Sequence, residues 1–153
     1  MSKTIENYKY EDIVSYLLSL IPKDEISRLQ GTIIEFCSEF AGFVDTYYHL
    51  SQIIPKNFTV IDFGAGWNAQ SYFFTEHKKY IAVTPPTDII EDSGMFCAPN
   101  CEIYRMTTGE FLRNNNVATD NVFAICNYVP NWYGEDSMKL VRENFQNVYT
   151  FYP

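Results

Sequence analysis

Apolar side chains recur at helical spacing through the first third of the chain. In residues 10–21 they fall three or four positions apart, which predicts a helix that Pro22 ends. Asp24 is suited to cap a following helix. From Ile26 to Leu50 the same step continues, so we expect one long helix bent near Gly42, or two helices in line, that ends before Pro55. This part of the chain is predicted to be entirely helical.

The pattern changes after Pro55, where short runs typical of β-strands alternate with polar or helical stretches. The predicted strands are 58–63, 80–83, 101–106, 121–128 and 147–152. The predicted helices are 68–76, 108–114 (capped by Thr107 or Thr108) and 135–145, and 84–100 is mostly loop. The run 121–128 is apolar nearly throughout, as expected of a strand buried on both faces.

Strands that alternate with helices indicate right-handed crossovers and a mainly parallel sheet. We therefore expect an α/β fold with five strands and helices on both faces. At 153 residues the chain is predicted to be one domain, with a helical amino-terminal part (1–55) packed on an α/β core (56–153).

Composition narrows the choice of partners. The formal net charge is −8, with no cluster of Lys or Arg, which argues against non-specific nucleic-acid binding and against anionic membranes. The start, MSKTIENYKY, has no apolar signal region, and we expect a cytoplasmic protein. The four cysteines form no CxxC pair and only two histidines occur, so we expect free thiols and no metal site.

The most informative stretch is TVIDFGAGWNAQSYFF, residues 59–74. It places Asp62, Gly64 and Gly66 at the carboxyl end of the first predicted strand, where ligands bind in parallel sheets. Glycines there allow a sharp turn and a close approach to a ligand. A pyrophosphate over this turn would be repelled by Asp62, whereas the sulfonium and ammonium groups of S-adenosylmethionine would not. The alternative is a tight strand-to-helix turn without a ligand.

Val60–Gly66 resembles motif I of the class I, Rossmann-like S-adenosylmethionine-dependent methyltransferases. Segments 79–83, 102–112 and 122–130 resemble later strands and a helix of that family, in the same order. The resemblance implies a sheet of order 3-2-1-4-5 and S-adenosylmethionine as cofactor. It implies a methyltransferase that acts on a small molecule or a protein side chain.

Several residues are candidates for this site by their place in the resemblance. The predicted cofactor-binding residues are Asp62, Gly64, Gly66, Trp67, Asn68, Gln70, Thr84 and Thr107. Asn127 and Tyr128, at the end of the fourth predicted strand, are the candidate catalytic residues. With Pro130, this segment resembles the short Asn/Asp/Ser-Pro-Pro-aromatic motif of the amino-methyltransferases, but its spacing differs by one residue. A plain strand end followed by a turn is the other interpretation of 127–130.

Two departures from the family pattern keep other functions open. Thr84 stands where the family has the acid that binds the ribose hydroxyls, and the chain ends after the fifth predicted strand, which leaves an exposed sheet edge. The second hypothesis is therefore a catalytically degenerate binding or regulatory module that acts through a protein partner or as a homodimer through that edge. The third is a nicotinamide-dependent oxidoreductase, which Asp62 and Thr84 disfavour.

Overall fold

The computed structural model describes residues 10–29, 44–85, 94–115, 117, 120–126 and 135–151. Its helical elements are α1 (Tyr10–Leu20), α2 (Lys23–Arg28), α4 (Val44–Ile53), the 3₁₀ helix η2 (Ala69–Phe74), α5 (Thr108–Asn114) and α6 (Ser137–Asn144). Its strands are β1 (Thr59–Phe63), β2 (Lys79–Thr84), β3 (Cys101–Arg105), β4 (Val122–Cys126) and β5 (Val148–Thr150). Among these helices none is both long and apolar enough to cross a membrane.

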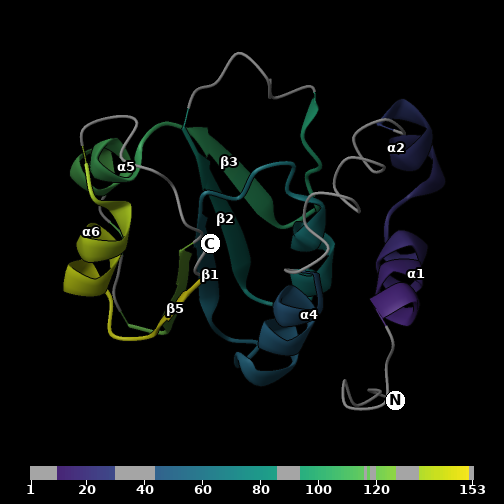
Figure 1. The fold of residues 1–153 in the computed structure, drawn as a ribbon, viewed down its shortest axis with the longest axis horizontal. Coiled ribbons are helices and arrows are strands. Elements are labelled where there is room, and N and C mark those ends of the chain that lie inside the picture. The colour runs from purple at the N-terminus through teal and green to yellow at the C-terminus, as the bar shows by residue number, and fades with distance from the viewer. Residues whose placement is uncertain are drawn as a thin grey trace.

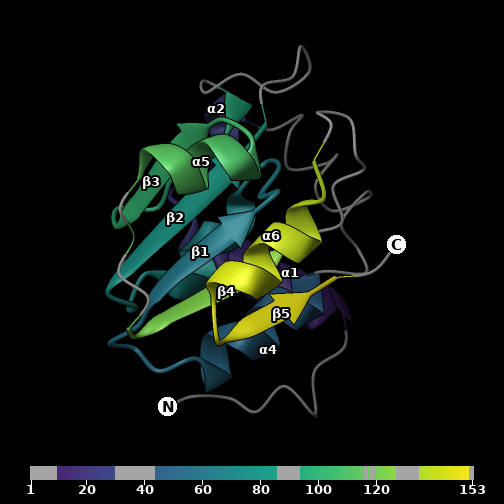
Figure 2. The same cartoon turned by 90° about the vertical axis from the view of Figure 1, so that its left-hand side faces the viewer.

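The five strands form one parallel sheet in the order β3-β2-β1-β4-β5. Strand order reverses direction between β1 and β4, because the chain builds outward from β1 through β2 to β3 and then returns to the other side of β1. Figure 2 shows the strands running the same way behind α5 and α6. The predicted Rossmann-like α/β fold and its strand order are thus confirmed.

Helices cover both faces of the sheet (Figure 1). Alternate side chains of each strand point to opposite faces, so Val60 of β1 packs in a core beneath α1, α4 and η2, while Ile61 and Phe63 pack in a second core beneath α5 and α6. Tyr80 and Ala82 of β2 join the first core, and Ile81 and Val83 join the second. The predicted burial of the fourth strand is confirmed by four buried residues among the five of β4.

Local sequence explains where several elements begin and end. Of the two predicted caps of α5, Thr107 is the one observed, and it accepts a hydrogen bond from the Glu110 amide (3.2 Å). Asp136 caps α6 in the same way, through the Lys139 amide (3.1 Å). The predicted helix at 68–76 is instead a shorter 3₁₀ helix, η2, in which all six side chains are buried.

The helical prediction for the first third of the chain holds in part. In α1, Ile13 and Leu17 are buried as their spacing predicts. α2 ends at Arg28 with Leu29 as its C-cap, so the predicted helix from Ile26 does not continue through Leu29. Residues 30–43, including the predicted bend at Gly42, lie outside the described residues.

Candidate functional site

The carboxyl edge of the sheet brings three of the predicted segments together. The glycine loop, residues 64–68, follows β1, Thr84 ends β2, and Thr107 follows β3. The amides of Gly64 (2.7 Å) and Ala65 (3.4 Å) both donate to the carbonyl of Val83, which directly precedes Thr84. The loop therefore folds against the end of β2, as expected for a ligand edge in a parallel sheet.

The glycine loop is a tight turn with little exposed surface. Gly64 and Gly66 have φ of 83° and 64°, in the left-handed region that favours glycine, and Asn68 has φ of 69°. Only Gly64 and Gly66 are partly exposed in the run 61–70; every other residue there is buried. A ligand at this loop would therefore meet backbone at the two glycines.

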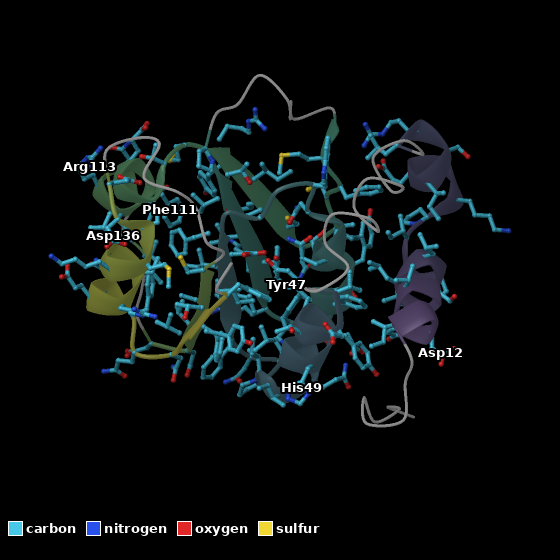
Figure 3. All side chains as sticks on the ribbon, in the orientation of Figure 1. Asp12, Tyr47, His49, Phe111, Arg113 and Asp136 are labelled. Carbon is cyan, nitrogen blue, oxygen red and sulfur yellow. The ribbon has the colours of Figure 1, made fainter. Side chains whose placement is uncertain are left out.

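Asp62 points away from this edge, into the core beneath α4. Its side chain is fully buried and accepts hydrogen bonds from Tyr47 (3.2 Å), Gln70 (2.9 Å) and, at short distance, Tyr80. Figure 3 shows Tyr47 near the centre of the molecule, on the α4 side of the sheet. Asp62, Tyr47, Gln70 and Tyr80 form what we call the Asp62 network.

Burial dominates the electrostatics of this network. Burial raises the pKa of Asp62 to about 6, and the hydrogen bonds from Tyr80, Gln70 and Tyr47 only partly offset that rise. The pKa of Tyr80 is raised well above its ordinary value, by burial first and then by the nearby Asp62 charge. Neither group is arranged to exchange protons with a ligand in solvent.

The other predicted loop residues also hold the protein together. Gln70 Nε2 donates to Asp62 and to the carbonyl of Ala65 (2.9 Å) and so ties the glycine loop to the network. Asn68, fully buried, donates to the carbonyl of Phe96 (2.8 Å), and its Oδ1 has no partner among the described residues. Trp67 is 8% exposed, and its carbonyl accepts a hydrogen bond from Phe96.

Thr84 differs from Asn68 because its hydroxyl, the one polar group of its side chain, has no partner among the described groups. The side chain is 3% exposed and the Oγ1 atom is fully buried. An unpaired buried hydroxyl costs about 1–3 kcal/mol, so this position is suited to a ligand group that completes the hydrogen bond. Thr107, by contrast, is occupied as the cap of α5 and also donates to the Glu110 carboxylate (3.2 Å).

The structure adds a carboxylate that sequence reasoning missed at the start of α5. Both oxygens of Glu135 accept from the amide of Gly109, at 3.0 and 3.1 Å. The sequence separates the two residues by a strand and a loop, so no local pattern could pair them. Asn127 and Tyr128, the predicted catalytic residues, lie outside the described residues.

The nucleoside part of S-adenosylmethionine fits these residues, whereas its ammonium group does not fit Asp62. The Thr84 hydroxyl, unpaired within the described ranges, and the partly exposed backbone of Gly64 and Gly66 suit a nucleoside ligand. Asp62 does not suit its ammonium group, because the carboxylate is buried and already accepts three hydrogen bonds. No group of three or more His, Cys, Asp or Glu side chains within the described ranges is arranged to hold a metal ion.

Two pockets of the described structure lie away from the carboxyl edge. One, of about 360 Å³, opens at the amino ends of the strands beside Lys79, Glu102 and Asn121. The other, of about 410 Å³, lies between α4 and β5 beside His49, Ile53 and Tyr149. Neither contains a predicted site residue. In a parallel sheet of this order, ligand sites lie at the carboxyl edge of the strands, where the strand order reverses.

Comparisons with known proteins assign no family to this arrangement: no family model, no curated protein and no solved structure matches the chain.

Proposed function

We propose that the chain binds S-adenosylmethionine at the carboxyl edge of its sheet and is a methyltransferase for a small molecule or a protein side chain. The observation that carries the proposal is a loop with two left-handed glycines at the end of β1, the central strand, where strand order reverses. The hydroxyl of Thr84 at the end of the neighbouring strand, which has no partner in the described part of the chain, supports it.

The residues have separable roles in this proposal. The backbone of Gly64 and Gly66 lets the ligand approach closely, and Thr84 hydrogen-bonds the nucleoside. Bound S-adenosylmethionine supplies an electrophilic methyl group. The chain contributes mainly position, because methyl transfer is an in-line displacement that gains most from alignment. The Asp62 network fixes the loop rather than contacting the ligand.

The test is calorimetric binding of S-adenosylmethionine and S-adenosylhomocysteine to the wild type and to Thr84→Val. The substitution keeps the shape and removes the hydroxyl. We expect micromolar binding by the wild type and about fivefold weaker binding by the variant, since a neutral hydrogen bond contributes about 1 kcal/mol. The free variant should be more stable by about 1 kcal/mol in urea unfolding, because it no longer buries an unpaired hydroxyl.

Weaker binding by a protein that has become more stable cannot result from unfolding. Thr84→Asp is the converse variant: a charge-assisted bond to ribose should tighten binding about tenfold or more, provided that circular dichroism shows a folded protein. Equal affinity of the wild type and Thr84→Val would remove Thr84 from the site. No binding at millimolar ligand would reject the proposal.

A second candidate is a degenerate module that keeps the fold without catalysis. Three observations favour it: Asp62 is buried, the Gly64 and Ala65 amides are already used by Val83, and position 84 lacks a carboxylate. It predicts weak or no binding of the wild type and no release of S-adenosylhomocysteine with amine, thiol or hydroxyl acceptors. Product release with any of these acceptors would exclude it.

A further inference from the structure

Two cysteines meet in a turn beside the glycine loop. The amide of Cys101 donates to the carbonyl of Ala98 (2.9 Å), which closes the turn, and the thiol of Cys97 donates to the carbonyl of Cys101 (3.3 Å). The two thiols are close enough that Cys97 helps to raise the pKa of Cys101. Both are free; Cys97 is exposed and Cys101 is half-buried. The Cys97 thiol is thus more accessible to a reagent in solution than the Cys101 thiol.

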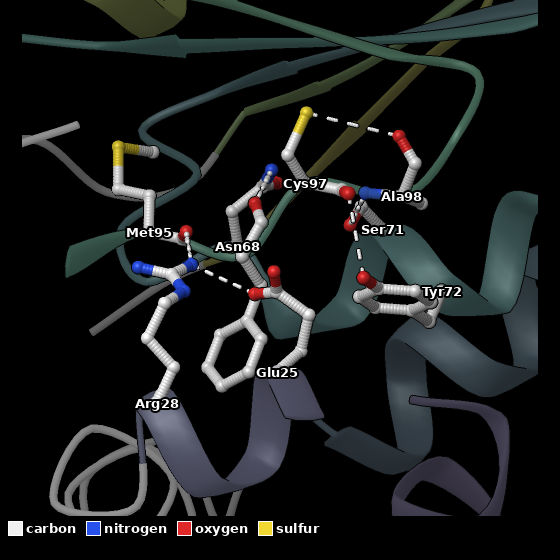
Figure 4. Close-up of polar contacts among 9 residues, drawn as sticks. Glu25, Arg28, Asn68, Ser71, Tyr72, Met95, Cys97 and Ala98 are labelled. Carbon is white, nitrogen blue, oxygen red and sulfur yellow. Dashed lines mark hydrogen bonds and ion pairs between the residues drawn. The ribbon is translucent and has the colours of Figure 1, made fainter. Parts of the chain in front are cut away.

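This turn is in direct contact with the glycine loop and with η2. Asn68 Nδ2 donates to the sulfur of Cys101 (3.3 Å) as well as to the carbonyl of Phe96. The carbonyl of Cys97 accepts a hydrogen bond from Tyr72 (3.3 Å). Figure 4 shows Asn68, Tyr72 and Cys97 gathered where these segments cross. A change at the sulfurs therefore alters a partner of Asn68, the left-handed residue at the end of the glycine loop.

We propose that Cys97 and Cys101 are a disulfide-forming site, and that its redox state is transmitted to the glycine loop through Asn68. The oxidant is a small disulfide such as oxidised glutathione. The proposal does not depend on S-adenosylmethionine binding. It rests on the paired thiols, on their unequal exposure and on the Asn68 contact.

The reaction proceeds by two exchanges. The Cys97 thiolate attacks one sulfur of the small disulfide, so that a mixed disulfide forms and one small thiol leaves. The Cys101 thiolate then attacks the Cys97 sulfur, the mixed bond breaks, and the second small thiol leaves. The two cysteines lose two electrons, the small disulfide gains them, and the two cysteine protons end on the released thiols.

The second exchange should be the slower one at neutral pH. Burial raises the pKa of Cys101 to about 12; Cys97 and Asp62 add to the rise and the Asn68 hydrogen bond opposes it. Among the described residues, the phenols of Tyr72 and Tyr80 also interact with this thiol. Below that pKa the thiolate fraction rises about tenfold per pH unit, so closure of the disulfide should accelerate about a hundredfold between pH 7 and pH 9.

The first experiment uses the wild type with excess oxidised glutathione and peptide mapping by mass spectrometry over time. We expect a mixed disulfide on Cys97 that converts to a Cys97–Cys101 disulfide. Cys101→Ser should stop at the mixed disulfide, and Cys97→Ser should react at least about tenfold more slowly. Cys126→Ser is the matched control, because this residue of β4 is fully buried in the second core and its replacement should leave the course unchanged.

The second measurement reads transmission to the loop. In a Trp132→Phe background, the remaining Trp67 fluorescence should change on oxidation and return on reduction, and hydrogen exchange at 64–71 should change with it. A mixed disulfide that never closes, even at pH 9, would overturn the disulfide-forming site. A closed disulfide that leaves both Trp67 fluorescence and exchange at 64–71 unchanged would overturn the transmission.

Discussion

Asp62 matches a sequence motif for ligand binding, yet its side chain is buried and hydrogen-bonded inside the protein. A carboxylate removed from water loses solvation, and hydrogen bonds from the protein restore part of it. Here the donors come from α4, η2 and β2, so the residue joins three elements at the first core. The loss of solvation that these hydrogen bonds do not offset raises the pKa of Asp62, and this shift can be measured.

Asp62→Asn should abolish one component of the pH dependence of stability. The pKa of Asp62 is about 6 in the folded protein, against an ordinary value of 3.8, so the folded state binds the proton more tightly. Its contribution to stability is complete below pH 3.8 and is lost as pH rises to about 6, a change of roughly 3 kcal/mol. An amide can keep the network: its oxygen accepts from Gln70 and Tyr80, and its nitrogen donates to Tyr47.

The measurement is urea unfolding of both proteins from pH 4 to pH 7. The free energy of unfolding of Asp62→Asn, relative to the wild type, should rise from pH 4 to about pH 6 and level off towards pH 7. His77, whose pKa is lowered by burial, contributes stability that is lost as pH falls, but it is common to both proteins and cancels. A difference that is constant with pH would show that Asp62 does not titrate as the network requires.

At the scale of elements, the start of α5 is held by a residue from outside the helix. The Glu135 carboxylate, just before α6, lies against the Gly109 amide and so joins the amino ends of the two helices that cover the second core. A Cβ on Gly109 would overlap this carboxylate. The φ of Gly109 is not in the left-handed region, so its backbone conformation does not require glycine. The space taken by the Glu135 carboxylate does.

A double-mutant cycle with Gly109→Ala and Glu135→Ala tests this contact. Alanine is favoured over glycine in a helix by up to about 1 kcal/mol, and that gain should appear fully only when Glu135 has been removed. In the presence of Glu135 the added methyl group displaces the carboxylate and loses its hydrogen bonds. We expect a coupling energy of about 1 kcal/mol in urea unfolding. Additive effects of the two substitutions would mean that the carboxylate contributes nothing to α5.

The elements also show what sequence patterns can and cannot predict. β4 and the strand–helix alternation were predictable because burial on both faces gives an unbroken apolar run. The cap of α5 was predictable because Thr107 and Glu110 are close in sequence. η2 was predicted as a longer helix, because its complete burial leaves no polar face whose period separates an α-helix from a 3₁₀ turn.

At the scale of the whole molecule, the candidate site was predictable in position and not in detail. Gly64 and Gly66 predicted a turn at the carboxyl edge, because few residues other than glycine adopt a left-handed φ. The roles of Asp62, Gln70 and Asn68 were not accessible, because their partners Tyr47, Tyr80 and Phe96 are distant in sequence and meet only in the folded sheet. Asp62, Gln70 and Asn68 could have been ligand-binding side chains by sequence, but their hydrogen bonds hold the glycine loop in place.

The two edges of the sheet keep self-association as a prediction for the molecule. β5 is an edge strand of three residues, and Tyr149 on it is 39% exposed. We expect sedimentation to show a mass that rises with concentration, and Tyr149→Lys to suppress the rise, because lysine blocks edge pairing. Tyr16→Lys is the control, at a similarly exposed tyrosine (41%) on α1. A monomer at all concentrations would contradict the prediction.

The sequence positions of the Asp62 network also indicate when it can form during synthesis. Its four members are residues 47, 62, 70 and 80, whereas the second core needs α5, β4 and α6 as well. During synthesis from the amino end, the last partner of Asp62 is therefore added well before the sheet can acquire its other half. We expect α4, β1, η2 and β2 to associate on the ribosome as the first unit. Asp62 should then already accept its hydrogen bonds from Tyr47 and Tyr80 when the later strands are synthesised.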